Sequence, residues 1–228
     1  MITLRRPSDE QLMERLRSLA DAPFNYDAVG CLARETVPSG FKFDQASFLL
    51  GTGETVWQAA REAIESWAMF PADMVSMVRL SDAVEEGAVV AVLCRAFGLW
   101  TINPARVFHV IEQNDGSARR FGFTYGTLPG HVESGEESFA VLMEPETDRV
   151  YYNIQAASRP DHPLVWLGYP FTRLMQARFR RMSGASMQSF VESRTDVNAA
   201  RNRGAEEELD VEAHSNTLAR ESRLTRSP

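Results

Sequence analysis

The stretch that decides the fold is residues 164–190, LVWLGYPFTRLMQARFRRMSGASMQSF. Its apolar residues recur at steps of three and four for most of its length, as on one face of an amphipathic helix. They are Leu164, Leu167, Phe171, Met175, Phe179, Met182 and Phe190. Arg173, Arg180 and Arg181 lie between them. The pattern predicts a long helix that begins after Pro163 and packs one face on the rest of the protein.

Upstream of this helix, the sequence contains six strand-like stretches separated by turn residues. They lie near residues 74–80, 87–97, 99–111, 118–127, 137–144 and 149–158. The separators, such as Glu85-Glu86-Gly87 and Asn114-Asp115-Gly116, are as short as hairpin turns. The economical interpretation is a meander of antiparallel strands.

Three further elements precede the meander. Residues 44–50 are apolar and aromatic enough to form a first strand, and residues 54–70 carry apolar side chains at helical spacing until Pro71 stops the helix. Near the N-terminus, Ser8 and Gln11 have the spacing of a capping box before an amphipathic run. The sequence therefore predicts a short helix ahead of the main domain.

The predicted fold class is α+β, with the element order β-α-β6-α and an extra short N-terminal helix. This order resembles the helix-grip architecture of START and Bet v 1-like proteins, in which a curved seven-stranded antiparallel sheet wraps around a long C-terminal helix, often leaving a cavity. We expect an N-terminal helix in residues 1–22 and a single domain over 23–192. Residues 193–228 are too polar to offset the entropy of ordering, which predicts a disordered tail.

Composition narrows the possible partners. The chain has 228 residues and a formal net charge of -7, so it does not favour binding to nucleic acid. Cys31 and Cys94 lack the spacing of a disulfide framework or a zinc site. The N-terminus lacks the apolar run of an export signal, and the longest apolar run, residues 88–94, is too short to span a bilayer. We expect a soluble, cytoplasmic protein.

Several uncommon stretches occur in order along the chain. They are FNYDAVG at residues 24–30, WAMF at 67–70, NPARV at 103–107, FGFTYGTLPGH at 121–131, GEESF at 135–139 and ASRP at 157–160. Together they resemble an uncharacterised family, domain of unknown function nineteen-ninety, which has bacterial and plant members. The resemblance covers roughly residues 24–190. It implies no particular reaction, cofactor or substrate.

The segment from Tyr125 to Glu137 combines a phenol, an imidazole, glycines and carboxylates in what we expect to be a long connection between two strands. One interpretation is turn chemistry, in which Gly126 and Gly130 supply unusual backbone angles and Pro129 stiffens a turn. The other is a binding loop held by a rigid scaffold.

Alternation along a strand places Glu137 on the same face as Phe139, with Glu136 opposite. If Phe139 faces the core, Glu137 is a buried acid that needs a partner, which Arg159 or Arg106 can supply. Such a pair is either structural or the polar anchor at one end of an apolar cavity.

The sequence gives weaker indications of a metal site, of acid-base catalysis and of anion binding. His131 and Glu133 alone do not make a metal site, and neither a metal nor a cofactor is predicted. Tyr125 with His131 or Glu137 can act as a general acid and base. Arg159 either holds a carboxylate or phosphate, or simply belongs to the junction before the long helix.

We therefore carry three hypotheses for function. The first is a binding protein for a hydrophobic or amphipathic small molecule held between the sheet and the C-terminal helix. The second is an enzyme of cyclase or dehydratase type in the same cavity. The third is an interaction protein or a membrane-associated pore, against which the odd strand number and the core helix argue. The candidate ligand-binding residues are Tyr125, Thr127, His131, Glu137, Arg159 and Arg106.

Overall fold

The structure, a computed structural model, describes residues 1–116, 118–162 and 168–224, with side chains described as far as Val197. The chain divides into two compact units, Met1–Val191 and Glu192–Pro228. The first unit contains every strand, the helices α1 and α2, and α4 as far as Val191.

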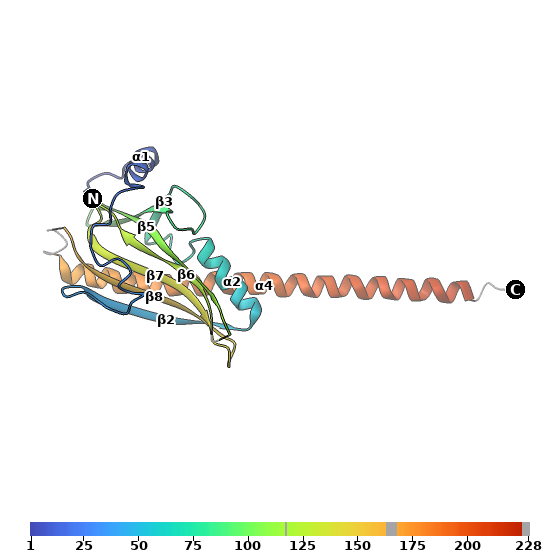
Figure 1. The fold of residues 1–228 in the computed structure, drawn as a ribbon. Helices are drawn as coiled ribbons and strands as arrows, with labels where there is room; N and C mark the ends of the chain where they lie inside the picture. The colour runs from blue at the N-terminus through green and yellow to red at the C-terminus, as the bar shows by residue number, and fades with distance from the viewer. Residues whose placement is uncertain (117, 163–167, 225–228) are drawn as a thin grey trace. The chain divides into compact units, whose positions relative to one another are not determined.

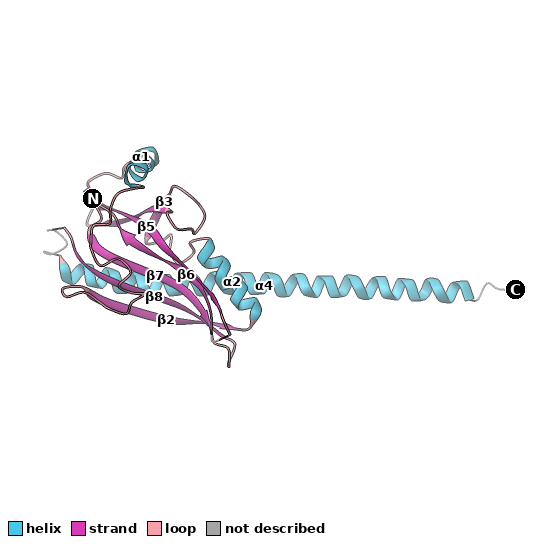
Figure 2. Ribbon diagram, viewed as in Figure 1, coloured by secondary structure: helices cyan, strands magenta, loops and turns pink. Residues whose placement is uncertain are grey.

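The described elements follow the predicted order (Figures 1 and 2). The helices are α1 (Asp9–Leu19), α2 (Glu54–Glu65) and α4 (Tyr169–Leu224). The strands are β1 (Ile2–Thr3), β2 (Lys42–Thr52), β3 (Val75–Arg79), β4 (Val89–Ala96), β5 (Leu99–Asn114), β6 (Arg119–Thr127), β7 (Glu133–Met143) and β8 (Arg149–Pro160). The order β-α-β6-α with an additional N-terminal helix is confirmed, and β1 is the one described strand that the sequence analysis did not predict.

All strand pairs are antiparallel, in the order β2-β8-β7-β6-β5-β4-β3, and β1 pairs with β5 outside this path. The strands from β3 to β8 form the predicted meander. The first long strand, β2, closes the far end by pairing with the last strand, β8, so that Ala46 lies opposite Ile154. Residues separated by more than 100 positions in the sequence are thereby brought to neighbouring strands.

The main core lies on one face of the sheet, here called the inner face. Phe123 of β6, Phe139 of β7 and Tyr152 of β8 are fully buried on it, together with Ile64 of α2 and Met187 of α4. These strand residues share a face because alternate side chains of paired strands point the same way. Burial of such large side chains contributes roughly 1.5–3 kcal/mol each.

Small residues let α4 approach the inner face closely. A Cβ atom on Gly184 would lie 2.5 Å from the ring of Phe48 on β2. One residue earlier, the hydroxyl of Ser183 is 2.7 Å from that of the buried Tyr152. This part of α4 is therefore in close contact with the sheet.

The opposite, outer face is covered by N-terminal residues. Helix α1 begins with the predicted capping box between Ser8 and Gln11. Its buried leucines pack in one cluster with alternate residues of β4. Further along the chain, Cys31 and Leu32 pack on Ala157 of β8. The sheet is therefore covered on both faces.

The connection between β6 and β7 differs from the prediction. Strand β7 begins at Glu133, so the connection spans only residues 128–132. Gly135 and Gly126 belong to strands, and at each a Cβ atom would collide with a neighbour, the carbonyl oxygen of Ala157 at 2.0 Å in the case of Gly135. These glycines permit close approach rather than turns. Gly130, with φ +95°, does lie in the turn as predicted.

Two helix boundaries also differ. Helix α2 ends at Glu65 rather than at residue 70, because Trp67 has φ +60°, outside the helical region. The indole N–H of Trp67 donates to the carbonyl oxygen of Asp82. Helix α4 begins at Tyr169, and the predicted helical positions Leu164 and Leu167 lie outside the described residues.

Helix α4 continues to Leu224, through the segment for which composition predicts a disordered tail. This segment contains Ala, Glu and Arg, which have high helix propensity. That the tail is dispensable for the folding of the first unit stays a prediction. Across the part of the chain that the structure describes, no helix is both long and apolar enough to cross a membrane.

Candidate functional site

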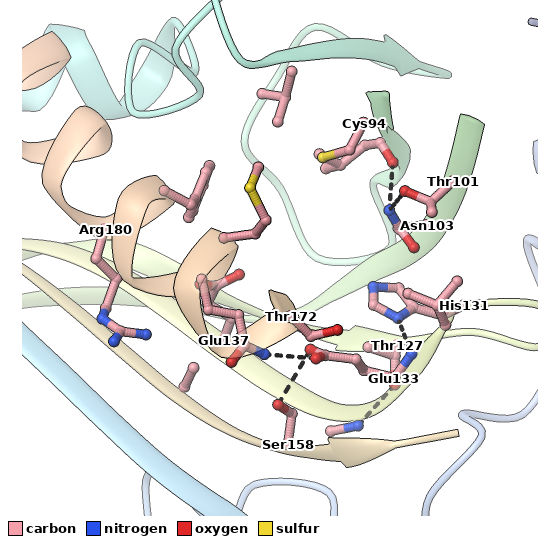
Figure 3. A pocket seen from close by; sticks show the side chains of 18 of the residues that line it. Cys94, Thr101, Asn103, Thr127, His131, Glu133, Glu137, Ser158, Thr172 and Arg180 are labelled. Carbon is pink, nitrogen blue, oxygen red and sulfur yellow. Dashed lines mark hydrogen bonds between the residues drawn. The ribbon is translucent and has the colours of Figure 1, made fainter. Parts of the chain in front are cut away.

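A cavity of about 240 Å³ lies between the inner face of the sheet and the first turns of α4 (Figure 3). Its apolar wall comes from several elements and is rich in aromatic rings. It includes Phe70, Val75, Val92, Phe171, Met175 and Phe179. Polar side chains from β2, β5, β6, β7, β8 and α4 line the remainder, so one cavity offers both kinds of contact.

Glu137 of β7 lies on the inner face, as alternation predicts, with Phe139 beside it in the core. The two paired residues Tyr125 and Glu137 form a hydrogen bond, in which the phenol donates to Glu137 Oε2 at 2.6 Å. Burial raises the pKa of Glu137 to about 7 and raises that of Tyr125 well above its ordinary value. Glu137 can therefore change its protonation state near neutral pH.

Glu133 is a second carboxyl group on the same strand face and in the same cavity. Gln176 of α4 donates to its Oε1 at 2.5 Å, and the Ser158 hydroxyl donates to its Oε2 at 3.3 Å. Burial raises the pKa of Glu133 to about 7. Among the described residues, no lysine or arginine lies within ion-pair distance of Glu133 or Glu137.

The arginines of α4 pair instead with Asp44 of β2. Arg173 donates to both carboxylate oxygens of Asp44, at 2.5 and 2.6 Å, and Arg180 approaches one of them at 3.4 Å. Hydrogen bonding to Arg173 lowers the pKa of Asp44. Arg173 and Arg180 are partly buried, whereas Arg181 is exposed. Local sequence patterns do not predict this pairing, because Asp44 comes from a strand distant in sequence.

His131 lines the cavity at the end of the β6–β7 connection. Its Nδ1 accepts a hydrogen bond of 2.9 Å from the backbone N–H of Glu133, which places the ring proton on Nε2. Burial lowers the pKa of His131 to about 3, so the ring is neutral at physiological pH. His131 therefore contributes no positive charge to the cavity.

Asn103 of β5 is buried, with 9% of its surface exposed, and lines the cavity. Its amide nitrogen donates to the Val92 carbonyl oxygen at 3.0 Å and to the Thr101 hydroxyl at 3.2 Å, which fixes the orientation of the amide. In Figure 3 its oxygen lies on the side of His131. This oxygen has no hydrogen-bond partner among the residues described.

Thr127 also lines the cavity, but its hydroxyl is engaged by the protein. The hydroxyl donates to the side-chain oxygen of Asn25 and accepts from the backbone N–H of Gly135 at 2.9 Å. The amide nitrogen of Asn25 in turn donates to the carbonyl oxygen of Glu133 at 3.0 Å. Thr127 and Asn25 thus fix the backbone on which the cavity carboxyl groups stand.

Arg159 and Arg106 are not brought to the cavity. The guanidinium of Arg159 lies 5.2 Å from the centre of the Phe41 ring, with the outer-face residues. Arg106 donates to the carbonyl oxygens of Ala20 and Ala22. The predicted ion pair of Glu137 with either arginine was wrong, because alternation along β8 directs Arg159 to the opposite face.

Glu136, on the outer face, is the most buried of the three β7 glutamates, with 2% exposure. It accepts hydrogen bonds from the Tyr26 hydroxyl at 2.9 Å and from the backbone N–H groups of Gly30 and Leu32, both at 2.7 Å. Both carboxylate oxygens are thus engaged by the N-terminal segment. The stretch FNYDAVG, singled out from the sequence, is explained in part by this contact.

Several polar cavity residues were not predicted from the sequence, among them Asp44, Asn103, Gln176 and Arg180, and Glu133 was considered only as a metal ligand. Two of these residues could have been found from the sequence. Asn103 begins the stretch NPARV, and Glu133 shares the parity of Glu137 once β7 is extended back to it. Among the described residues, no group of three His, Cys, Asp or Glu side chains is arranged to hold a metal ion.

Comparison with solved structures finds proteins of low sequence identity. A hypothetical protein from Helicobacter pylori is 11% identical with a TM-score of 0.46, covering 66% of this chain and 88% of that one. A START superfamily protein from Mycobacterium smegmatis is 10% identical with a TM-score of 0.43, covering 67% of this chain and 97% of that one.

Comparison with sequences finds relatives that match this chain over most of their own length. The UPF0548 protein of Dictyostelium discoideum is 33% identical over 196 residues, covering 78% of this chain and 90% of that protein. The UPF0548 protein of Arabidopsis thaliana is 30% identical over 199 residues, covering 82% and 95% respectively. The family model described as Domain of unknown function (DUF1990) matches residues 25–186. The chain belongs to this family.

Proposed function

We propose that the protein binds a small amphipathic molecule in the cavity between the inner face of the sheet and α4. The observation that carries the proposal is a largely apolar cavity into which two carboxyl groups, Glu133 and Glu137, project without an arginine or lysine partner among the described residues. Binding sites typically combine apolar walls with a few placed polar groups.

The energetics of burial support this assignment. A carboxyl group in an apolar environment is costly unless it is protonated, paired or fully hydrogen-bonded. Burial accordingly raises the pKa of both Glu133 and Glu137 to about 7. A bound polar group that donates to them would offset part of this cost, while the aromatic wall would hold an apolar portion.

The cavity volume sets the size of the bound part. A volume of about 240 Å³ corresponds to about eight water volumes at about 30 Å³ each. The part of the ligand that the cavity holds is therefore small, on the order of eight non-hydrogen atoms by the same measure.

A second candidate is a proton-transfer enzyme of cyclase or dehydratase type. The observation that favours it is the 2.6 Å hydrogen bond between Tyr125 and Glu137, together with a Glu137 pKa of about 7. A carboxyl group that titrates near the working pH both donates and accepts protons efficiently. This activity would use the same cavity and would require binding first.

Native mass spectrometry of the full-length protein, purified without detergent, tests the binding function. The variant Ala156→Phe adds a ring on the inner face, where Ala156 lines the cavity. The control Asn153→Phe adds the same ring to the same strand but on the outer face.

We expect a retained small molecule in the unmodified protein and in Asn153→Phe, and its loss in Ala156→Phe with the fold maintained by circular dichroism. Retention of the same molecule at equal occupancy in Ala156→Phe would place the ligand elsewhere. Absence of any retained molecule, together with failure of all added amphipathic probes to bind, would contradict the proposed function.

A further inference from the structure

The charges around the cavity do not balance. Glu136 contributes to the lining, but its carboxylate is engaged by the N-terminal segment. The other three carboxyl groups there are those of Asp44, Glu133 and Glu137. Two guanidinium groups accompany them, that of Arg180 in the lining and that of Arg173 paired with Asp44. His131 is neutral because burial lowers its pKa to about 3. With all three acids ionised, this set lacks one positive charge.

Both arginines form their ion pairs with Asp44. Arg173 spends two hydrogen bonds on Asp44, and the amino group of Arg180 that approaches Asp44 lies at 3.4 Å from it. Glu133 and Glu137 receive donors only from uncharged groups among the described residues, such as Gln176 and Tyr125. A cation from outside the protein would neutralise the remaining negative charge.

A second, independent feature also calls for a hydrogen-bond donor. The amide oxygen of Asn103 is buried in the cavity wall and has no partner within the described part of the chain. Its orientation is fixed by the two bonds that the amide nitrogen makes. An unsatisfied buried acceptor of this kind destabilises the protein until a donor reaches it.

We propose that the ligand is a small amine, whose ammonium group is bound by the carboxylates of Glu133 and Glu137 while its apolar part contacts the aromatic wall. The rings of Phe70, Phe171 and Phe179 in that wall also favour a nearby cation through their π-electron faces. This inference rests on the proposed function, since it assigns the chemical class of the ligand in the same cavity.

Three probes of matched size separate the ligand classes. 1-Octylamine, 1-octanol and octanoate have the same chain and carry a cationic, a neutral and an anionic head group. Isothermal titration calorimetry of the full-length protein at about pH 8 measures each affinity with Glu133 and Glu137 mostly ionised, given their pKa of about 7. We expect octylamine to bind about tenfold or more tightly than octanol, and octanoate to bind weakest.

A matched pair of variants tests whether the preference for amine over alcohol arises at Glu137. Glu137→Gln keeps the shape of the side chain and its ability to accept from Tyr125 but removes the charge. Glu146→Gln makes the same change in the exposed turn after β7. We expect Glu137→Gln to reduce the preference for amine over alcohol by about tenfold, and Glu146→Gln to leave it unchanged. Glu133→Gln provides the same test should Glu137→Gln fail to fold.

The outcomes separate the two proposals. Octanoate binding as tightly as octylamine, or a full amine preference in both cavity variants, would overturn the assignment of an amine while leaving a binding cavity. Octanol and octylamine binding with equal affinity would overturn it in the same way. Failure of all three probes to bind would count against the proposed function itself.

Discussion

Glu136 and Glu137 are neighbours on β7, yet they stand in opposite environments. Glu136 points to the outer face, where a phenol and two backbone N–H groups engage both of its oxygens. Glu137 points into the cavity, where one phenol donates to it and no lysine or arginine of the described chain pairs with it. Two adjacent buried carboxyl groups thus differ in how completely the protein satisfies them.

Helix α4 shows the same contrast. Met187 is fully buried in the inner-face core, where small residues bring the helix close to the sheet. Met175, three turns earlier, lines the cavity. Burial by itself therefore does not identify a binding group. The informative feature is a buried polar group whose hydrogen bonds or charge the protein leaves incomplete.

The largest expected effect comes from placing a charge in the closed core. Met187→Asp should destabilise by about 5 kcal/mol or unfold the protein, because an isolated buried carboxylate has no partner there. Met175→Asp should cost less than half as much, since its carboxylate can reach the cavity. Urea unfolding followed by circular dichroism measures both. Equal losses would show that Met175 also belongs to a closed core.

The next effect concerns Glu136. Glu136→Gln should destabilise by about 3 kcal/mol, because an amide cannot accept hydrogen bonds from all three donors that meet the carboxylate. Glu137→Gln should cost below about 1 kcal/mol at pH 8, since its amide oxygen still accepts from Tyr125. The free energies of unfolding in urea provide the test. A larger loss in Glu137→Gln than in Glu136→Gln would reverse the roles assigned to the two residues.

The pH dependence of stability tests the environment of Glu137. Glu137 has a folded-state pKa of about 7, above its ordinary value, so the folded state holds its proton more tightly than the unfolded state. Its contribution to stability is therefore present at acid pH and is lost as pH rises through the window from about 4.5 to 7. The groups that set this pKa besides burial are Tyr125, Glu133, Arg180 and Asp44.

We expect Glu137→Gln to lose less stability than the unmodified protein between about pH 5 and pH 7.5, by on the order of 2 kcal/mol. Urea unfolding at a series of pH values measures the difference. The exposed control Glu146→Gln should show the unmodified slope. Parallel curves for the unmodified protein and Glu137→Gln would mean that Glu137 titrates normally.

The smallest effect is expected from the C-terminal tail. A chain that ends at Asp196 retains the first compact unit, Met1–Val191, so its Tm should change by less than about 2 °C. A chain that ends at Ser183 lacks the buried Met187 and Val191 and should not fold. Thermal unfolding by calorimetry measures both. A large drop in the first case would show that the tail stabilises the domain.

The sequence predicts much of this fold because local periodicity carries it. The six strands of the meander, the capping box at Ser8 and the long helix that includes Met175 and Phe179 follow from alternation and helical spacing. The face of Glu137 follows from the same alternation. What local patterns do not contain is the pairing of segments far apart, such as β2 with β8.

The candidate site is only partly predictable for that reason. Tyr125, Thr127, His131 and Glu137 do line one cavity, but Arg159 and Arg106 do not. Asp44 enters through the β2–β8 pairing and commits the arginines of α4. The strand was predicted to begin at residue 137, which left out the first residues of β7 and with them Glu133.

The most direct test of ligand binding in the cavity uses the methionines as reporters. With the methionine methyl groups labelled with carbon-13, two-dimensional NMR follows each methyl as 1-octylamine or 1-octanol is added. Met74 and Met175 line the cavity, whereas Met69 and Met187 lie in the closed core. We expect the methyl signals of Met74 and Met175 to shift with saturation while those of Met69 and Met187 stay in place. Shifts confined to other methionines, or no shift at any probe concentration, would contradict a binding site in this cavity.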